Sequence, residues 1–172
     1  MPATHIIGSA YICQLTEFGS FGSSMRTSSR LAKMMAMDLD QAREVLRSQH
    51  RAVFCALKSD GTPAMSPVLV ALDDNGDVLV STRATAYKTK QVQRDPAVSL
   101  CVLPDSFFGR WIQINGTATV VPLPDAMDLL VQYYRTISGE HPDWNDYRAA
   151  MEREQRVVLR ITLTGAGPDR TG

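Results

Sequence analysis

Residues 81–96 read Ser-Thr-Arg-Ala-Thr-Ala-Tyr-Lys-Thr-Lys-Gln-Val-Gln-Arg-Asp-Pro and directly follow the apolar run Val78-Leu79-Val80. The run predicts a strand, and Tyr87–Arg94 is expected to form a short helix, with Thr85 as its cap and Asp95-Pro96 at its end. The start of a helix carries unpaired backbone N–H groups and a partial positive charge, to which Lys88 and Lys90 would add full charges. This junction therefore predicts an anion site, with phosphate as the expected ligand, although a basic, solvated surface helix would have the same composition.

Short strands and tight turns surround this junction. Asp60-Gly61 and Asn75-Gly76 are turn signals between apolar runs, so the first three strands should form an antiparallel meander. Pro67 cannot donate a ladder hydrogen bond, and its strand is expected at an edge or a bulge. A bulge is also expected at Asn115-Gly116. The predicted strands are Ala52–Leu57, Met65–Leu72, Val78–Thr82, Ala97–Leu103, Arg110–Val121 and Val157–Leu163. The predicted helices are Asp38–Gln49, Tyr87–Arg94, Pro124–Ser138 with Gly139 as its C-cap, and one that Asp143 caps.

Six strands with short connections favour a mainly β fold with peripheral helices, in which an antiparallel sheet closes into a barrel and so removes its exposed edges. One domain is expected over residues 37–165. Residues 1–36 are rich in serine and glycine, which indicates a disordered or mispredicted extension, with the natural start near Met34, Met35 or Met37. Residues 166–172 are expected to fray.

The overall composition excludes several classes of protein. Lysine and arginine number 18 and aspartate and glutamate number 18, so there is no basic surplus for general nucleic-acid binding. The sequence has no apolar run of ~18 residues, and no membrane span is expected. The cysteines Cys13, Cys55 and Cys101 form no CxxC pair, and the last two lie in apolar runs. Reduced, buried thiols in the cytoplasm are therefore expected.

Motifs for hydrolytic or metal chemistry are missing from the sequence. The histidines His5, His50 and His141 lie in no HExxH or GxSxG pattern, and no Cys/His spacing indicates zinc. There is also no GxGxxG or Walker loop, and no catalytic residue is indicated. A β core, one anion site and aromatic and polar side chains on a facing strand are typical of a protein that holds a phosphorylated flat cofactor.

A set of short motifs occurs in order between about residues 38 and 163. They are Asp60-Gly61-Thr62-Pro63, Ser66-Pro67-Val68, Val80-Ser81-Thr82, Lys88-Thr89-Lys90, Arg94-Asp95-Pro96, Gly116-Thr117-Ala118 and the run from Tyr134-Arg135 through Gly139-Glu140-His141-Pro142-Asp143-Trp144 to Asp146-Tyr147-Arg148. On these motifs the chain resembles the pyridoxamine 5'-phosphate oxidase-like, FMN-binding split β-barrel superfamily, and within it the deazaflavin (coenzyme F420)-dependent oxidoreductases. The resemblance implies a six-stranded antiparallel split β-barrel.

The resemblance also implies a homodimer with two cofactor sites at the subunit interface. It implies that Ser66, Pro67 and Val68 line the ring of the cofactor, that Ser81 and Thr82 approach it, that Lys88 and Lys90 hold the phosphate, and that Arg110 and Trp111 come from the other subunit. The implied chemistry is hydride transfer between reduced F420 and an organic substrate with an electron-poor double bond.

Two alternatives remain at this stage, namely an FMN-binding flavoprotein of the same fold and a non-catalytic protein that carries a cofactor or tetrapyrrole. A longer basic track of Lys88, Lys90, Arg94 and Arg110 would favour F420, whose phosphodiester is followed by an acidic tail. The vitamin B6 reaction is disfavoured, because Thr164-Gly165-Ala166-Gly167-Pro168 near the C-terminus lacks the Arg-x-His pair of the pyridoxamine phosphate oxidases proper.

Overall fold

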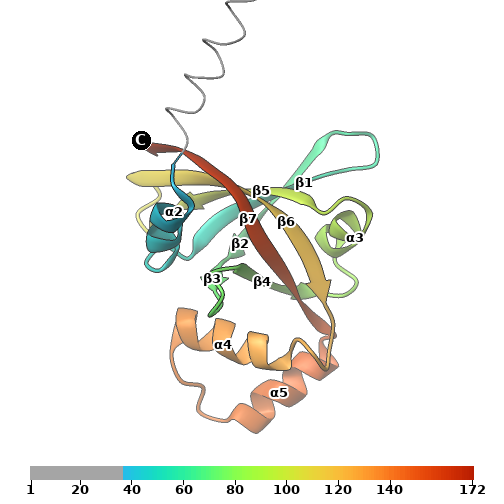
Figure 1. Cartoon of the computed structure of the whole chain (residues 1–172). Coiled ribbons are helices and arrows are strands. Elements are labelled where there is room, and N and C mark those ends of the chain that lie inside the picture. Colours follow the sequence, from blue (N-terminus) through green and yellow to red (C-terminus); the bar gives the residue numbers. More distant parts are fainter. Residues whose placement is uncertain (1–36) are drawn as a thin grey trace, which may run out of the picture. The chain divides into compact units, whose positions relative to one another are not determined.

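The computed structural model describes residues 37–172, so the expectations for residues 1–36 lie outside it. Within this range one antiparallel sheet of seven strands has the order β2-β1-β5-β6-β7-β4-β3 (Figure 1). The strands are β1 Arg51–Leu57, β2 Pro63–Leu69, β3 Ala71–Leu72, β4 Val78–Arg83, β5 Ala97–Leu103, β6 Arg110–Val121 and β7 Arg156–Thr171. The helices are α2 Leu39–Leu46, α3 Tyr87–Arg94, α4 Met127–Ser138 and α5 Trp144–Arg153. The prediction of a mainly β fold with peripheral helices is confirmed.

The prediction of six strands is wrong, because the expected strand Met65–Leu72 divides into β2 and β3. β2 pairs with β1, and β3 pairs with β4 at the opposite edge of the sheet. Val70 lies between them, fully buried, and its N–H donates to the carbonyl of His50 at 2.8 Å. The sheet therefore curls into a half-barrel whose two edges are joined through one residue. Pro67 lies in the edge strand β2, as predicted.

The C-terminal tail is also ordered differently from the prediction, because β7 continues to Thr171. Its last residues pair with the start of β6, with Arg110 opposite Thr171 and Ile112 opposite Asp169. The register of β6 and β7 shifts between Asn115 and Gly116, where a bulge was predicted, and also between Ile112 and Ile114. A Cβ on Gly116 would lie 2.5 Å from Cγ2 of Ile161, so glycine is needed for β6 and β7 to approach at this point.

The inner face of the sheet and α2 enclose the main core. Phe54, Leu100, Ile112 and Ile114 are at most 1% exposed, and Leu46 of α2 packs among them. The side chain of Asp38 caps α2 by accepting a hydrogen bond from the N–H of Asp40 at 2.8 Å. The alternation of buried and exposed residues along β1, β5 and β6 gives the sheet one face toward this core and one face outward.

A second core lies where α4 and α5 cover β4 and β7 (Figure 1). Leu79 and Val158 of the sheet pack with Leu130 and Met151 of the helices. Asp143 caps α5, and Gly139 ends α4 with φ of 80°, both as predicted, whereas α4 begins at Met127 instead of Pro124. None of the helices within residues 37–172 is long and apolar enough to cross a membrane.

Candidate functional site

Two neighbouring pockets lie along the edge strand β2. The first, which we call the α3 pocket, has a volume of about 300 Å³ and is lined by Ala64, Met65, Ser66, Ala86, Tyr87, Lys88 and Gln91. The second, which we call the Phe107 pocket, has a volume of about 640 Å³ and is lined by Arg51, Ala52, Val53, Pro67, Val68, Leu69, Leu103 and Phe107. Consecutive residues of β2 thus contribute first to a pocket with a cation and then to a mainly apolar one.

The α3 pocket has the electrostatic features of an anion site. The N-cap of α3 is Ala86, which provides no side-chain cap, so the prediction of Thr85 as the cap is wrong. The N–H groups of Tyr87 and Lys88 precede the first intrahelical hydrogen bonds, and a helix leaves such groups for an outside partner. Lys88 is half-buried, and burial lowers the pKa of its ammonium group. A bound anion would offset that cost of burial.

Gln91 is a residue of this pocket that the sequence analysis missed. It is 2% exposed, and its Nε2 has no hydrogen-bond partner within residues 37–172. The spacing could have indicated it, because residues three apart on a helix, such as Lys88 and Gln91, lie on one face. What remained invisible in the sequence was the burial of the amide.

The structure brings together some of the predicted site residues and separates others. Ser66 and Lys88 line the α3 pocket, and Pro67 and Val68 line the Phe107 pocket. Lys90 is exposed and lines neither pocket. Ser81 and Thr82 lie on β4, the first half-buried and the second buried, and they line neither pocket.

Arg110 and Trp111 lie at the start of β6, next to the end of β7. Nε and Nη2 of Arg110 donate to both carboxylate oxygens of Asp169 at 2.9 and 2.8 Å. This pairing lowers the pKa of Asp169. Arg94 donates to the carbonyl of Leu57. Of the four side chains expected in a basic track, only Lys88 lines the α3 pocket.

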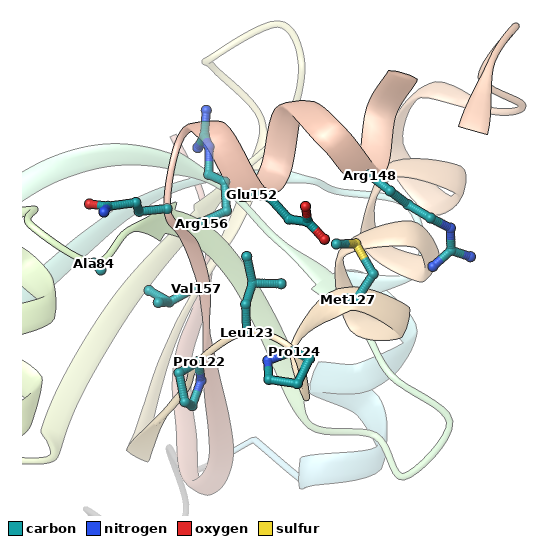
Figure 2. A pocket seen from close by; sticks show the side chains of 10 residues that line it. Ala84, Pro122, Leu123, Pro124, Met127, Arg148, Glu152, Arg156 and Val157 are labelled. Carbon is teal, nitrogen blue, oxygen red and sulfur yellow. The ribbon is translucent and has the colours of Figure 1, made fainter. Parts of the chain in front are cut away.

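A larger pocket of about 800 Å³ lies where β6 ends and α4 begins, and it contains none of the predicted residues. Figure 2 shows Leu123, Pro124 and Met127 on one side of it and the side chains of Arg156, Glu152 and Arg148 along the other. Its arginines already have acidic partners, because Arg148 lies 3.6 Å from Asp128 and Arg156 lies 2.8 Å from Glu154. The two pockets along β2 are therefore the stronger candidate site, despite their smaller volumes. In the described part of the chain no three His, Cys, Asp or Glu side chains are grouped so that they could hold a metal ion.

Comparison with known proteins links this architecture to a family. The family model described as pyridoxamine 5'-phosphate oxidase matches residues 39–167. Among solved structures, a conserved hypothetical protein from Mycobacterium tuberculosis has a TM-score of 0.63 at 22% identity, covering 77% of this chain and 84% of the other. An F420 reductase has a TM-score of 0.58 at 17% identity, covering 73% of this chain and 95% of the other. HutZ, the heme storage protein of Vibrio cholerae, has a TM-score of 0.59 at 14% identity, covering 79% of this chain and 98% of the other. At these identities the likeness to the solved structures shows a shared fold.

Proposed function

Since the chain belongs to the pyridoxamine 5'-phosphate oxidase family, we propose that it is a deazaflavin-dependent oxidoreductase. In this proposal coenzyme F420, when bound, supplies the hydride for an organic substrate with an electron-poor double bond. The protein's part is to bind the coenzyme, orient its ring and shield the reaction from water. The resemblance of the ordered motifs to F420-dependent oxidoreductases and the likeness to a solved F420 reductase support this choice.

The observation that carries the proposal is the succession of the two pockets along β2. Met65 lies in the α3 pocket and Leu69 lies in the Phe107 pocket. In an extended strand they are separated by roughly 13 Å, at ~3.3 Å per residue. This arrangement suits an elongated ligand with an anionic group at one end and a flat apolar ring at the other.

The residues present fit such a ligand at both ends. Lys88, Ser66 and the free N–H groups at the start of α3 would hold a phosphate oxygen, and the buried unpaired amide of Gln91 indicates a polar partner that the chain itself does not provide. Pro67 and Val68 would contact one face of the ring. These groups bind and orient, and their close spacing on a rigid strand and helix favours a fixed position for the ring.

A second copy of the chain is the proposed partner, because apolar side chains on the outer face of β1 and β2 remain exposed. Leu57 and Leu69 are each 42% exposed and Met65 is 69% exposed. Met65 is opposite Cys55 in the ladder, and Cys55 and Cys101 are free, half-buried thiols instead of the buried ones that we expected. An uncovered apolar face of this kind is typical of a protein interface. In a homodimer the partner would cover it and bring Arg110 and Trp111 toward the ligand.

Heme storage is the second reading, because HutZ shares the fold. A heme site in a protein commonly uses a histidine as axial ligand. Nδ1 of His50 lies 3.1 Å from the carbonyl oxygen of Val70, and His141 packs against Tyr134 and Trp144. Neither histidine lines the α3 pocket or the Phe107 pocket, and His5 lies outside the described residues. The geometry therefore favours a phosphorylated flat cofactor over heme.

Titration of the purified protein with F420 and, separately, with FMN tests the proposal through tryptophan fluorescence. The chain has two tryptophans, Trp111 near the proposed interface and Trp144 on α5. A Trp144→Phe variant leaves Trp111 as the single reporter, and Trp111→Phe is its control. Micromolar binding of F420 with weaker binding of FMN is expected. Tight binding of FMN would assign the chain to the flavoproteins, and binding of neither would overturn the cofactor proposal.

A further inference from the structure

We infer that Gln91 is a ligand-binding residue of the α3 pocket, where its side-chain amide donates a hydrogen bond to a singly charged phosphate ester that also contacts Lys88. The inference rests on the proposed function. It adds a residue that binds the phosphate and the charge of the phosphate that the pocket prefers.

Gln91 differs from the other buried polar residue of its helix. Thr89 is 1% exposed, and its hydroxyl donates to the carbonyl of Arg83 at 2.8 Å. The amide of Gln91 is equally buried but has no such partner for Nε2 within residues 37–172. Buried donors without partners are rare in native proteins, and each calls for an explanation. Because Gln91 lines the pocket, a ligand group in that pocket is the simplest missing acceptor.

The other residues that line the α3 pocket indicate the charge of the ligand that would accept this hydrogen bond. Lys88 is the only residue with a full charge among those that line the α3 pocket. The other donors are neutral, namely Ser66, Gln91 and the first N–H groups of α3. One cation with neutral donors balances one negative charge. A phosphodiester carries one, whereas a phosphate monoester carries nearly two at neutral pH. The pocket is thus matched to a phosphodiester.

Contact with Nε2 requires a local rearrangement, because the surface of this atom is buried. Gln91 itself lines the pocket, so a rotation of its own side chain would turn the amide toward a ligand there. Side-chain rotations of this size are common when ligands and partners bind.

The test compares F420 with its deazariboflavin chromophore, which lacks the phosphodiester and the acidic tail attached to it, in fluorescence titrations with the full chain. The variant is Gln91→Met, which keeps the length of the side chain and removes the donor. The control is Gln93→Met, the same change at an exposed position of α3. For Gln91→Met we expect the affinity for F420 to fall about tenfold or more, the usual effect of a lost hydrogen bond to a charged group, with unchanged affinity for the chromophore. The melting temperature of the unliganded protein should stay the same or rise, because an unsatisfied buried group is removed.

The outcomes separate this inference from the proposed function. If the wild-type protein binds F420 no better than the chromophore, the anion site itself is wrong. If the wild type prefers F420 and Gln91→Met keeps the same preference, the proposed function stands and the role of Gln91 is overturned. A variant that loses affinity for both ligands equally would show a structural amide, which also overturns it. Gln91→Glu provides a second check, since the added negative charge should weaken F420 binding more than Gln91→Met does.

Discussion

The sheet has two outward apolar surfaces, of which helices cover one and leave the other exposed. Over β4 and β7, the helices α4 and α5 leave Leu79 and Val158 with 0% exposure. Over β1 and β2 there is no such cover in the described part of the chain, and Met65 is 69% exposed. Both surfaces consist of the same kind of side chain, so hydrophobicity alone does not distinguish them.

The covered surface is held by many specific contacts. The ring centroids of Tyr134, His141, Trp144 and Tyr147 lie between 5.0 and 5.8 Å apart, and the hydroxyl of Tyr147 donates to the carbonyl of Leu130 at 2.9 Å. The open surface borders the two pockets and the exposed Phe107. The surface over β4 and β7, which the chain's own helices bury, is thus expected to contribute to folding stability. The uncovered surface over β1 and β2 is where a ligand and a second copy are proposed to bind.

The largest expected effect is on the covered surface. Leu130 is fully buried, and Leu130→Ala should lower the free energy of unfolding by about 3 kcal/mol, because it leaves a cavity between α4 and the sheet. Urea denaturation followed by circular dichroism measures this. Leu69→Ala, at a position 42% exposed, should cost less than about 1 kcal/mol at a concentration where both proteins are monomeric. Equal losses would remove the distinction between the two surfaces.

On the open surface, Met65→Lys should act on association instead of folding. A lysine there would place an unpaired charge in the proposed dimer interface and raise the dissociation constant by about 100-fold, or ~2.7 kcal/mol. Sedimentation velocity over a concentration series gives this constant. Thr136→Lys, on the exposed side of α4, should leave it unchanged. A dimer that is insensitive to Met65→Lys would place the interface elsewhere.

At the anion end of the open surface, Lys88→Ala should weaken F420 binding by roughly 1–3 kcal/mol, the usual scale of a charge-assisted contact. Lys90→Ala is the matched control, because Lys90 is exposed and lies outside the α3 pocket. The same fluorescence titration gives both affinities. An unchanged affinity in Lys88→Ala would refute the phosphate assignment.

Smaller effects are expected from two tyrosines of the helical layer. Tyr147 bonds within the covered surface, whereas the hydroxyl of Tyr133 donates to the carbonyl of Leu69 at the end of β2, at 3.1 Å. Tyr147→Phe should lower the free energy of unfolding by about 1 kcal/mol, because the buried carbonyl of Leu130 loses its donor. Tyr133→Phe should lower it less, since water can reach the partly exposed site. Thermal melts of both variants decide whether this order holds.

An alkaline effect accompanies these tyrosines. Burial raises the pKa of Tyr133 and of Tyr147 to about 12, above the usual 10.0. The unfolded chain therefore loses these protons at a lower pH than the folded one, and the contribution to stability is complete below pH 10 and is lost as the pH rises toward 12. We expect Tyr147→Phe to lose less stability than the wild type between pH 10 and pH 12. Parallel slopes in that range would contradict the shifted pKa.

Much of the fold could be predicted, because apolar runs and turn signals specify strands locally. The antiparallel pairs β1–β2 and β3–β4, the edge position of Pro67 and the caps at Asp143 and Gly139 follow from such signals. The predicted three-stranded meander is wrong, because its middle strand divides between the two edges of the sheet. The division at Val70 could not be predicted, because a change of pairing partner leaves no mark in a continuous apolar run. The extension of β7 was missed for a related reason, since Gly165–Thr171 has weak strand propensity and is ordered by its pairing with β6.

The candidate site could be predicted less completely. A strand-to-helix junction with Lys88 indicates an anion site by local rules, and the structure places Ser66 from another strand beside it. Gln91 was missed, because the burial of a glutamine depends on packing from distant segments. Lys90 was predicted to bind the phosphate together with Lys88, but it lies outside the α3 pocket. Residues two positions apart point to different sides of a helix.

The passage of the chain through Val70 has a consequence for engineering. Since β2 and β3 form opposite edges of the sheet, one peptide segment sets how far apart those edges can be. Each residue inserted at this point would give up to ~3.5 Å of additional slack without changing any strand pairing. The length of this connection therefore limits the separation of the two edges. Lengthening it is a way to widen the half-barrel for a larger ligand.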